Sequence, residues 1–155
     1  MIRNACMEDV KAIYNLLHHF SQKGLLLARS YSSLYDQLRD FQVYAVQEED
    51  GERIVGVGAL HISWENLAEI RSLAVDENYQ RRGIGSQLVS SCLAEADSFG
   101  IPRVFTLTYQ PEFFKTLGFT AIDKKELPHK VWSDCINCPK FPDCNEEAMI
   151  WQKKG

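Results

Sequence analysis

The stretch from Glu69 to Gly85, EIRSLAVDENYQRRGIG, constrains the fold of this chain more than any other. It begins with a mostly apolar run from Ile70 to Val75, which predicts a covered strand of a sheet. Asp76 to Asn78 break that run, and a helix-like apolar period follows Gly85 at once. The inner face of this helix is expected to carry Leu88, Cys92, Ala96 and Phe99. The sequence therefore predicts a strand, a short loop and a helix in direct succession.

The loop between this strand and helix has the composition of an anion site. The first turn of a helix presents unpaired backbone N–H groups, and its dipole favours negative charge. Gly83 and Gly85 remove side chains that would keep a ligand away from those groups. Arg81 and Arg82 add positive charge beside them. The segment is therefore suited to a pyrophosphate.

The same order of elements with Q-R-R-G-I-G resembles the acetyl-CoA signature of the GNAT acetyltransferase superfamily. The segment from Phe113 to Phe119, FFKTLGF, resembles a second conserved segment of that superfamily, a short helix that ends on Gly-Phe. The resemblance implies an α/β fold with a mixed, mostly antiparallel central sheet flanked by helices, and acetyl-CoA as co-substrate. It also implies a V-shaped opening between the fourth and fifth strands that admits the cofactor. The alternative is an ordinary strand, turn and helix with a basic loop.

The remaining chain supplies the other elements of such a fold. An Asp-Gly pair at Asp50 and Gly51 predicts a hairpin turn, and Gly56 and Gly58 predict a bulge or a close backbone approach in the strand that follows. The expected strands cover residues 2–5, 43–47, 53–64, 69–75, 104–108, 119–122 and 148–151. The expected helices cover residues 7–23, 30–40 (with Ser30 or Ser32 as the cap), the long segment ending at 99, and 111–118.

Length and charge limit the class of protein. At 155 residues the chain predicts one domain, residues 1–155, with a cysteine-containing segment at 127–146 inside it. The formal charge of −4 argues against a general nucleic-acid-binding role. No apolar run approaches the roughly 20 residues of a membrane helix, and no signal-peptide pattern is present, so a cytoplasmic protein is expected. Five cysteines fit a reducing compartment, and the oligomeric state stays open, with a homodimer among the alternatives.

The resemblance also implies roles for individual residues. Glu69 corresponds to a glutamate that several members use as a base, and the backbone N–H of Leu73 would polarise the acetyl carbonyl. The backbone of Leu73, Ala74 and Val75 would pair with the pantetheine arm. The pyrophosphate would be held by Gln80, Arg81, Arg82, Gly83, Ile84, Gly85 and Ser86. The alternative for Glu69 is an exposed or salt-bridged strand residue.

The proton donor to the leaving thiolate departs from the family pattern. Many members carry Tyr where this chain has Phe114, which has no proton to give but lies in the cofactor-binding segment. Tyr109, at the end of the fifth predicted strand, is the substitute candidate. The alternatives are that Tyr109 is a core residue with a satisfied hydroxyl, or that the thiolate leaves directly into water.

The C-terminal third resembles short bacterial N-acetylglutamate synthases. The resembling segments are LPHKVW at 127–132, C-x-x-C-P at 135–139 with Cys144, and EEAM at 146–149. This resemblance implies transfer of the acetyl group to the α-amine of L-glutamate, in arginine biosynthesis. Two carboxylates on the acceptor call for cations with forked donors, and Arg29 and Arg71 are the candidates, with Lys130 as a third. The alternative for each is a surface or salt-bridged residue.

Two questions stay open at the level of sequence. Cys135, Cys138 and Cys144 with His129 could hold a structural zinc, but only one close cysteine pair is present, so no metal is assigned. The acceptor could also be another small amine or a protein amine. A non-catalytic acetyl-CoA-binding regulatory module is the alternative from a different class, and it stays open because Phe114 stands where many family members have Tyr.

Overall fold

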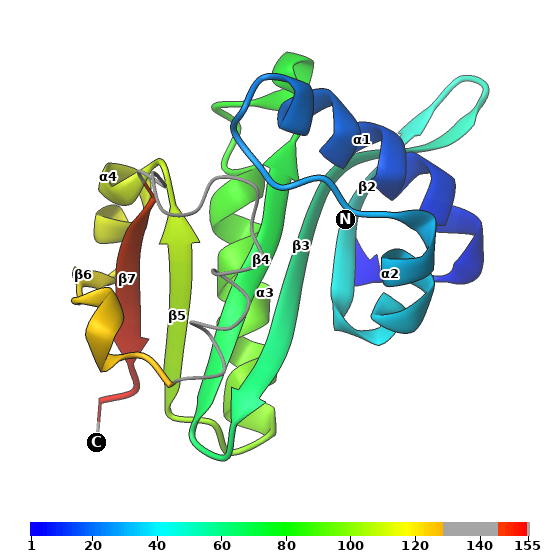
Figure 1. Ribbon diagram of the computed structural model, residues 1–155. Coiled ribbons are helices and arrows are strands. Elements are labelled where there is room, and N and C mark those ends of the chain that lie inside the picture. The colour runs from blue at the N-terminus through cyan, green and yellow to red at the C-terminus, as the bar shows by residue number, and fades with distance from the viewer. Residues whose placement is uncertain (129–145, 155) are drawn as a thin grey trace. The chain divides into compact units, whose positions relative to one another are not determined.

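A computed structural model describes residues 1–128 and 146–154. These residues form two compact units, the first from Met1–Leu60 with Ile70–Glu95, and the second from His61–Glu69 with the chain from Ala96 onward. Figure 1 labels the α-helices and the strands β2 to β7. The elements are β1 (Ile2–Asn4), η1 (Met7–Asp9), α1 (Val10–Gln22), α2 (Tyr31–Asp36), η2 (Leu38–Asp40), β2 (Phe41–Glu48), β3 (Gly51–Trp64), β4 (Leu67–Val75), η3 (Glu77–Tyr79), α3 (Ile84–Ser98), β5 (Arg103–Thr108), α4 (Pro111–Thr116), β6 (Thr120–Ala121), η4 (Lys124–Glu126) and β7 (Glu147–Gln152).

The strand pairing confirms the predicted sheet. The hydrogen-bonded order is β1-β2-β3-β4-β5-β7-β6. β1 with β2, β2 with β3, β5 with β7 and β6 with β7 are antiparallel, whereas β4 with β5 is parallel. The parallel pairing joins Leu67–Glu69 to Arg103–Phe105. The sheet is therefore mixed and mostly antiparallel, and the order of strands and helices along the chain is the predicted one.

In the first unit, helices cover both faces of the sheet. α1 and α2 bury Ile13, Leu17 and Leu34 against Phe41 and other apolar residues of the strands. The opposite face is covered by α3, whose Ile84 and Leu88 pack with Val55 of β3. Both faces of the sheet can be apolar because successive side chains of a strand point to opposite faces.

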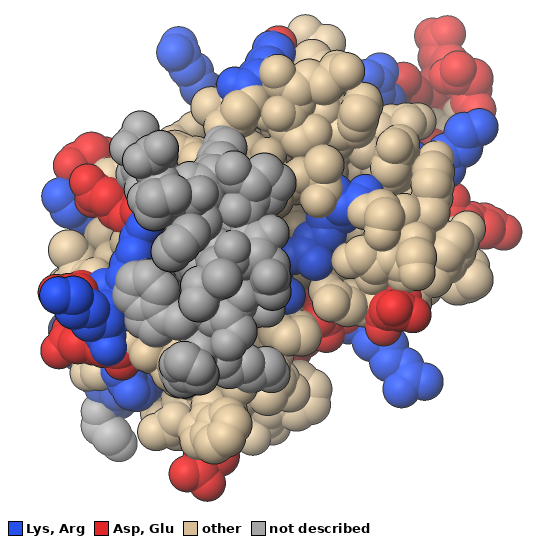
Figure 2. Space-filling view, viewed as in Figure 1, with Lys and Arg blue, Asp and Glu red and all other residues tan. Residues whose placement is uncertain are grey.

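Gly56 allows α3 to lie close to the sheet, as the sequence predicts. A Cβ atom built on Gly56 would lie 3.0 Å from Ile84 Cγ2 and 3.1 Å from Leu88 Cδ1. The register between β2 and β3 shifts at Tyr44 and Ala45, which confirms a bulge in this part of the hairpin. The hairpin turn itself is Glu49-Asp50, because Glu48 pairs with Gly51. Acidic side chains gather at this tip (Figure 2).

The second unit is built around β5 and β7. Phe105, Leu127 and Ile150 form its apolar cluster with neighbouring residues. α4 ends in a turn in which Gly118 has φ 93° and Phe119 N–H donates to the Phe114 carbonyl at 3.1 Å. This turn confirms the short helix that ends on Gly-Phe.

Two local predictions were wrong. Phe99 was expected on the inner face of the long helix, but its side chain is 60% exposed. α3 ends at Ser98, Gly100 takes a left-handed φ of 75°, and Ile101 N–H bonds to the Ala96 carbonyl at 2.9 Å, so Ile101 is buried in place of Phe99. The second helix was expected to run to residue 40, but α2 stops at Asp36 and a separate 3-10 turn, η2, follows. Its cap is Ser30, whose Oγ accepts from Ser33 N–H.

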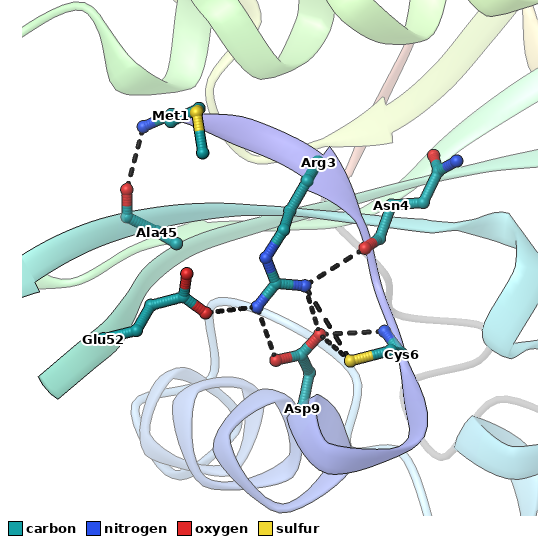
Figure 3. Close-up of polar contacts among 7 residues, drawn as sticks. All are labelled: Met1, Arg3, Asn4, Cys6, Asp9, Ala45 and Glu52. Atoms are coloured by element: carbon teal, nitrogen blue, oxygen red, sulfur yellow. Dashed lines mark hydrogen bonds and ion pairs between the residues drawn. The ribbon is translucent and has the colours of Figure 1, made fainter.

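An ion-pair network ties β1 to the start of α1 (Figure 3). The Arg3 guanidinium donates to both oxygens of Asp9, at 2.7 and 2.9 Å, and also pairs with Glu52 of β3. The Cys6 N–H donates to Asp9 at 2.8 Å. These hydrogen bonds lower the pKa of the buried Asp9 carboxyl to about 2, and the Arg3 hydrogen bond is the largest cause. No helix of the described residues is both long and apolar enough to cross a membrane.

Candidate active site

The loop before α3 has the backbone shape of an anion site. Arg81 and Gly83 adopt left-handed φ values of 66° and 79°, and Arg82 between them does not. When successive residues alternate between left-handed and right-handed backbone conformations, their N–H groups converge and form a small concavity that can bind an anion. The first hydrogen bond of α3 runs from the Gln87 N–H to the Gly83 carbonyl at 3.0 Å. The N–H groups of the first turn, which precede Gln87, have no partner within the helix and can therefore contribute to the same anion site. The predicted pyrophosphate segment therefore has the expected local geometry.

Contacts within the first unit hold this loop in place. Asp76 N–H donates to the Val55 carbonyl at 2.7 Å, and the Asp76 carboxylate accepts a hydrogen bond from the Arg53 guanidinium at 3.0 Å. The Tyr79 hydroxyl donates to Glu48 at 2.9 Å, and this bond raises the pKa of the Tyr79 phenol. These contacts anchor the segment before the loop to β2 and β3.

The charged side chains of the loop remain at the surface. Arg81 and Arg82 are exposed, and the Arg82 guanidinium stacks 5.0 Å above the centroid of the Tyr79 ring. The Gln80 amide donates to the Val75 carbonyl at 2.9 Å. A pantetheine amide that paired with Val75 would therefore share or replace the bond from Gln80.

The second half of β4 carries a backbone break at Ser72. Its φ of 54° lies in the left-handed region, which a serine in a strand rarely adopts. Leu73 follows the break and is half-buried, whereas the side chain of Ala74 is only 6% exposed in the core. Ala74 can therefore serve a cofactor only through its backbone.

The structure links Arg29 to this break. Arg29 lies in the loop between α1 and α2, and its Nε donates to Ser72 Oγ at 3.1 Å. Its Nη1 donates to Gln37 Oε1 at 3.0 Å and makes a longer contact of 3.4 Å with Ser33 Oγ. Arg71, the second candidate for acceptor binding, is half-buried on β4 one residue before Ser72. Two predicted substrate residues thus lie next to one strained position of β4.

The second unit holds the other candidates. Glu69 is half-buried on β4 and lies opposite Phe105 of β5. Tyr109 is half-buried directly after β5. Phe114 is 4% exposed, and its ring packs edge-on against Phe119 with 5.1 Å between centroids. The replacement of Tyr by Phe at this position therefore extends the apolar core of the unit.

The proposed zinc ligands lie outside the described residues. His129, Cys135, Cys138 and Cys144 all fall in 129–145, as does Lys130. Within residues 1–128 and 146–154, no group of three or more His, Cys, Asp or Glu side chains is arranged to hold a metal ion.

A cavity of about 900 Å³ opens in the first unit among η1, α1, the β2–β3 hairpin and η3. Its lining includes the carboxylates of Glu8, Asp9, Glu48, Asp50, Glu52, Asp76 and Glu77. A polyanionic cofactor would be repelled by this lining, so the cavity is not part of the candidate active site.

Three polar residues of the site were missed from the sequence. Ser33, Gln37 and Ser72 contact Arg29, but no motif singles them out. Gln37 is eight residues from Arg29 across a short helix, and Ser72 is 43 residues away. Such contacts form only when the tertiary fold brings the elements together, so no local pattern signals them.

This mixed sheet, with a loop between β4 and α3 that has the backbone shape of an anion site, is the arrangement expected of an acyltransferase that uses an acyl-CoA. Residues 10–119 match the Acetyltransferase (GNAT) family, and the chain belongs to that family. It is an acetyl-CoA-dependent N-acetyltransferase, a function shared by relatives across most of its length. An uncharacterized N-acetyltransferase of Chlorobaculum tepidum is 38% identical over 96% of this chain and 94% of its own. An amino-acid acetyltransferase of Mycobacterium tuberculosis is 36% identical over 86% of this chain and 76% of its own.

Solved structures agree with this assignment. A Mycobacterium tuberculosis protein crystallised with CoA superposes with a TM-score of 0.84 at 30% identity, and 99% of each chain is covered. The N-acetylglutamate synthase of Neisseria gonorrhoeae, complexed with coenzyme A and N-acetyl-glutamate, superposes with a TM-score of 0.87 at 25% identity. All of this chain is covered there, but only 35% of the Neisseria chain. Acetyl-CoA as the co-substrate fits both complexes and the loop geometry above.

Proposed function

We propose that this enzyme transfers the acetyl group of acetyl-CoA to the α-amine of L-glutamate, in arginine biosynthesis. The observation that carries the proposal is the position of the half-buried Arg29 guanidinium, which donates a hydrogen bond to Ser72. Ser72 directly precedes Leu73, the residue whose N–H is proposed to contact the acetyl carbonyl. A cation in this position suits an acceptor that carries a carboxylate. The names of the Mycobacterium and Neisseria relatives support an amino acid as the acceptor.

The acceptor is proposed to be held by two arginines. Arg29 and Arg71 would each bind one carboxylate of glutamate, and guanidinium and carboxylate groups match as forked donors and acceptors. Glutamate held at both ends would have its α-amine fixed in direction. Orientation of this kind can lower the activation free energy by several kcal/mol.

The proposed reaction is a direct attack in a ternary complex. Glu69, acting through a water molecule, accepts a proton from the α-ammonium, and the neutral nitrogen attacks the thioester carbonyl carbon. The Leu73 N–H donates to the carbonyl oxygen as negative charge develops there. The carbon–sulfur bond then breaks, and Tyr109 gives its hydroxyl proton to the departing thiolate. The nitrogen loses its second proton to the Tyr109 phenolate as the amide forms, and Glu69 releases the first proton to solvent. The segment from Gln80 to Ser86 holds the pyrophosphate throughout.

A thiol-release assay with a panel of amines tests the proposal. Free CoA is measured with L-glutamate, L-glutamine, L-aspartate, polyamines and short peptides, and the products are identified by mass spectrometry. Selective formation of N-acetylglutamate is the expected result. Turnover of a polyamine or peptide instead would keep the N-acetyltransferase and overturn the acceptor. The cytoplasmic location remains a prediction of the sequence, and a homodimer remains one alternative for the oligomeric state.

A further inference from the structure

The Tyr79 side chain is held at both of its ends within the first unit. Its ring is half-buried and packs against the apolar cluster that joins β3 to α3, formed by Val55, Ile84 and Leu88. Its hydroxyl donates to the Glu48 carboxylate at 2.9 Å. A side chain that is held at the ring and at the hydroxyl has little freedom to turn. The ring is therefore a fixed surface at the end of η3, directly before the loop that precedes α3.

The Arg82 guanidinium lies over this ring, with 5.0 Å between its central carbon and the ring centroid. The side chain is exposed, and within residues 1–128 and 146–154 it forms no hydrogen bond or ion pair. A cation over the face of an aromatic ring is attracted by the negative charge of that face, and the contact uses none of its N–H donors. The N–H groups of the Arg82 guanidinium therefore stay available to an anion.

The carboxylates at the start of η3 have other cationic partners. Asp76 accepts from the Arg53 guanidinium at 3.0 Å, and Glu77 pairs with Lys23 at the end of α1. These carboxylates consequently do not pair with Arg82, whose contact in the described part of the chain is an uncharged ring. An arginine without a carboxylate partner can bind a phosphate with both prongs of its fork and with its full charge.

We infer that Tyr79 is a positioning residue whose ring holds the Arg82 guanidinium for a phosphate group of acetyl-CoA. An exposed arginine that is already oriented loses less rotamer freedom when it binds its ligand. The inference rests on the part of the proposed function that places the cofactor phosphates at the loop before α3, and it is independent of the acceptor. The phosphate is either the diphosphate or the 3′-phosphate of the cofactor, because a guanidinium binds both through the same oxygen geometry.

Substitutions at two positions separate the ring from the hydroxyl and from general packing. Tyr79→Phe keeps the ring and removes the bond to Glu48, Tyr79→Leu removes the ring, and Arg82→Met removes the guanidinium. The variant with both Tyr79→Leu and Arg82→Met completes a double-mutant cycle. Tyr35→Leu is the matched control, because Tyr35 is an exposed tyrosine on α2 of the same unit. Calorimetric titration of each full-chain variant measures the dissociation constants for acetyl-CoA and for acetyl-3′-dephospho-CoA, and melting temperatures are recorded beside them.

The expected result is that loss of the ring weakens acetyl-CoA binding only while Arg82 is present. Tyr79→Leu raises the dissociation constant about threefold to fivefold, the size of a cation–π contact at an exposed site. Arg82→Met raises it about tenfold or more, and Tyr79→Leu in that background adds nothing further. Tyr79→Phe and Tyr35→Leu stay within about a factor of two of the wild type. With the dephospho analogue, the effects of both positions persist if the bound group is the diphosphate and vanish if it is the 3′-phosphate, and either result supports the inference.

Other outcomes overturn the inference in distinguishable ways. An unchanged dissociation constant in Tyr79→Leu, or the same fold-change with and without Arg82, shows that Tyr79 does not act through Arg82 and leaves the proposed function standing. A Tyr79→Phe variant that binds as weakly as Tyr79→Leu assigns the effect to the hydroxyl and its bond to Glu48, and also overturns it. Wild-type affinity in Arg82→Met removes Arg82 as a phosphate ligand and the role of Tyr79 with it. A wild type that binds no acetyl-CoA overturns the proposed function and this inference together.

Discussion

Glu69 is the side chain on which the proposed proton transfer depends. Glu69→Gln keeps the size of the side chain and removes the base, so kcat should fall by about 100- to 10,000-fold. The affinity for acetyl-CoA should stay within a factor of two, because Glu69 is not expected to touch the cofactor. Thiol release at saturating substrates and calorimetric titration with acetyl-CoA measure the two effects.

The control for this substitution is Glu65→Gln. Glu65 is an exposed glutamate in the turn between β3 and β4, in the same unit as Glu69. It should behave as the wild type. If Glu69→Gln kept its full kcat, the base would have to be another group, and Glu69 would be a structural residue of β4.

Arg29 should affect the acceptor and not the cofactor. Arg29→Met retains much of the apolar stem but loses the guanidinium, and the KM for L-glutamate should rise about 10- to 100-fold, the worth of a hydrogen bond between charged groups. Arg39→Met is the matched control, because Arg39 is an exposed arginine on η2 of the same unit. Initial rates at varied glutamate measure the difference. Equal KM values in the two variants would remove Arg29 from the acceptor site.

At the scale of elements, the contact of α3 with the sheet depends on Gly56. Gly56→Ala would press a methyl group against Ile84 and Leu88, at 3.0 and 3.1 Å, and should lower the free energy of unfolding by about 1–3 kcal/mol. Because Ile84 begins α3 directly after Gly83, the KM for acetyl-CoA should rise as well. Urea denaturation and kinetics with varied acetyl-CoA measure the two effects.

Gly58→Ala is the control within the same strand. Its added Cβ would meet Leu73 Cδ1 at 3.3 Å, and the end of a flexible side chain can move by that little. It should therefore cost less stability than Gly56→Ala. If Gly58→Ala were the less stable of the two variants, α3 would move away from an added methyl group more easily than the side chain of Leu73 does.

The elements could be predicted from sequence because their signals are local. The period of apolar residues, the Asp-Gly pair and the Ser30 cap each specify structure within a few residues. The elements and the Ser30 cap were confirmed, and the hairpin forms where the Asp-Gly pair predicts one, but its turn is Glu49-Asp50 because Gly51 already pairs in β3. Phe99 was misassigned because continued periodicity and a glycine stop compete over the last turn of a helix. Gly100 decided that competition by turning the chain and burying Ile101.

The site divides in the same way. The loop from Gln80 to Ser86 could be predicted because one contiguous segment supplies its N–H groups. The partners of Arg29 could not, because Gln37 and Ser72 reach it only after α2 and β4 have packed into one unit. The ion pair of Arg3 with Asp9 and Glu52 was missed for the same reason, since Glu52 is 49 residues from Arg3.

At the scale of the whole molecule, that ion-pair network should govern part of the acid stability. The pKa of Asp9 is lowered from 3.8 to about 2 in the folded state, so its ionised form favours folding. A lowered folded-state pKa contributes stability above the unfolded value and loses it as the pH falls through the folded value. The contribution should therefore be complete above about pH 5 and should vanish between pH 3.8 and about 2.

The substitution Asp9→Asn isolates this contribution from the other carboxylates. Near pH 6 the variant should be less stable than the wild type by about 2 kcal/mol, the free energy that corresponds to the lowered pKa. The difference should close as the pH falls toward 2, because the wild-type carboxyl is then protonated too. Urea denaturation between pH 2 and pH 6 measures it, and Asp36→Asn, at an exposed aspartate that ends α2, is the control. A difference that stayed constant over this pH range would mean that Asp9 stabilises the fold by packing and not by its charge.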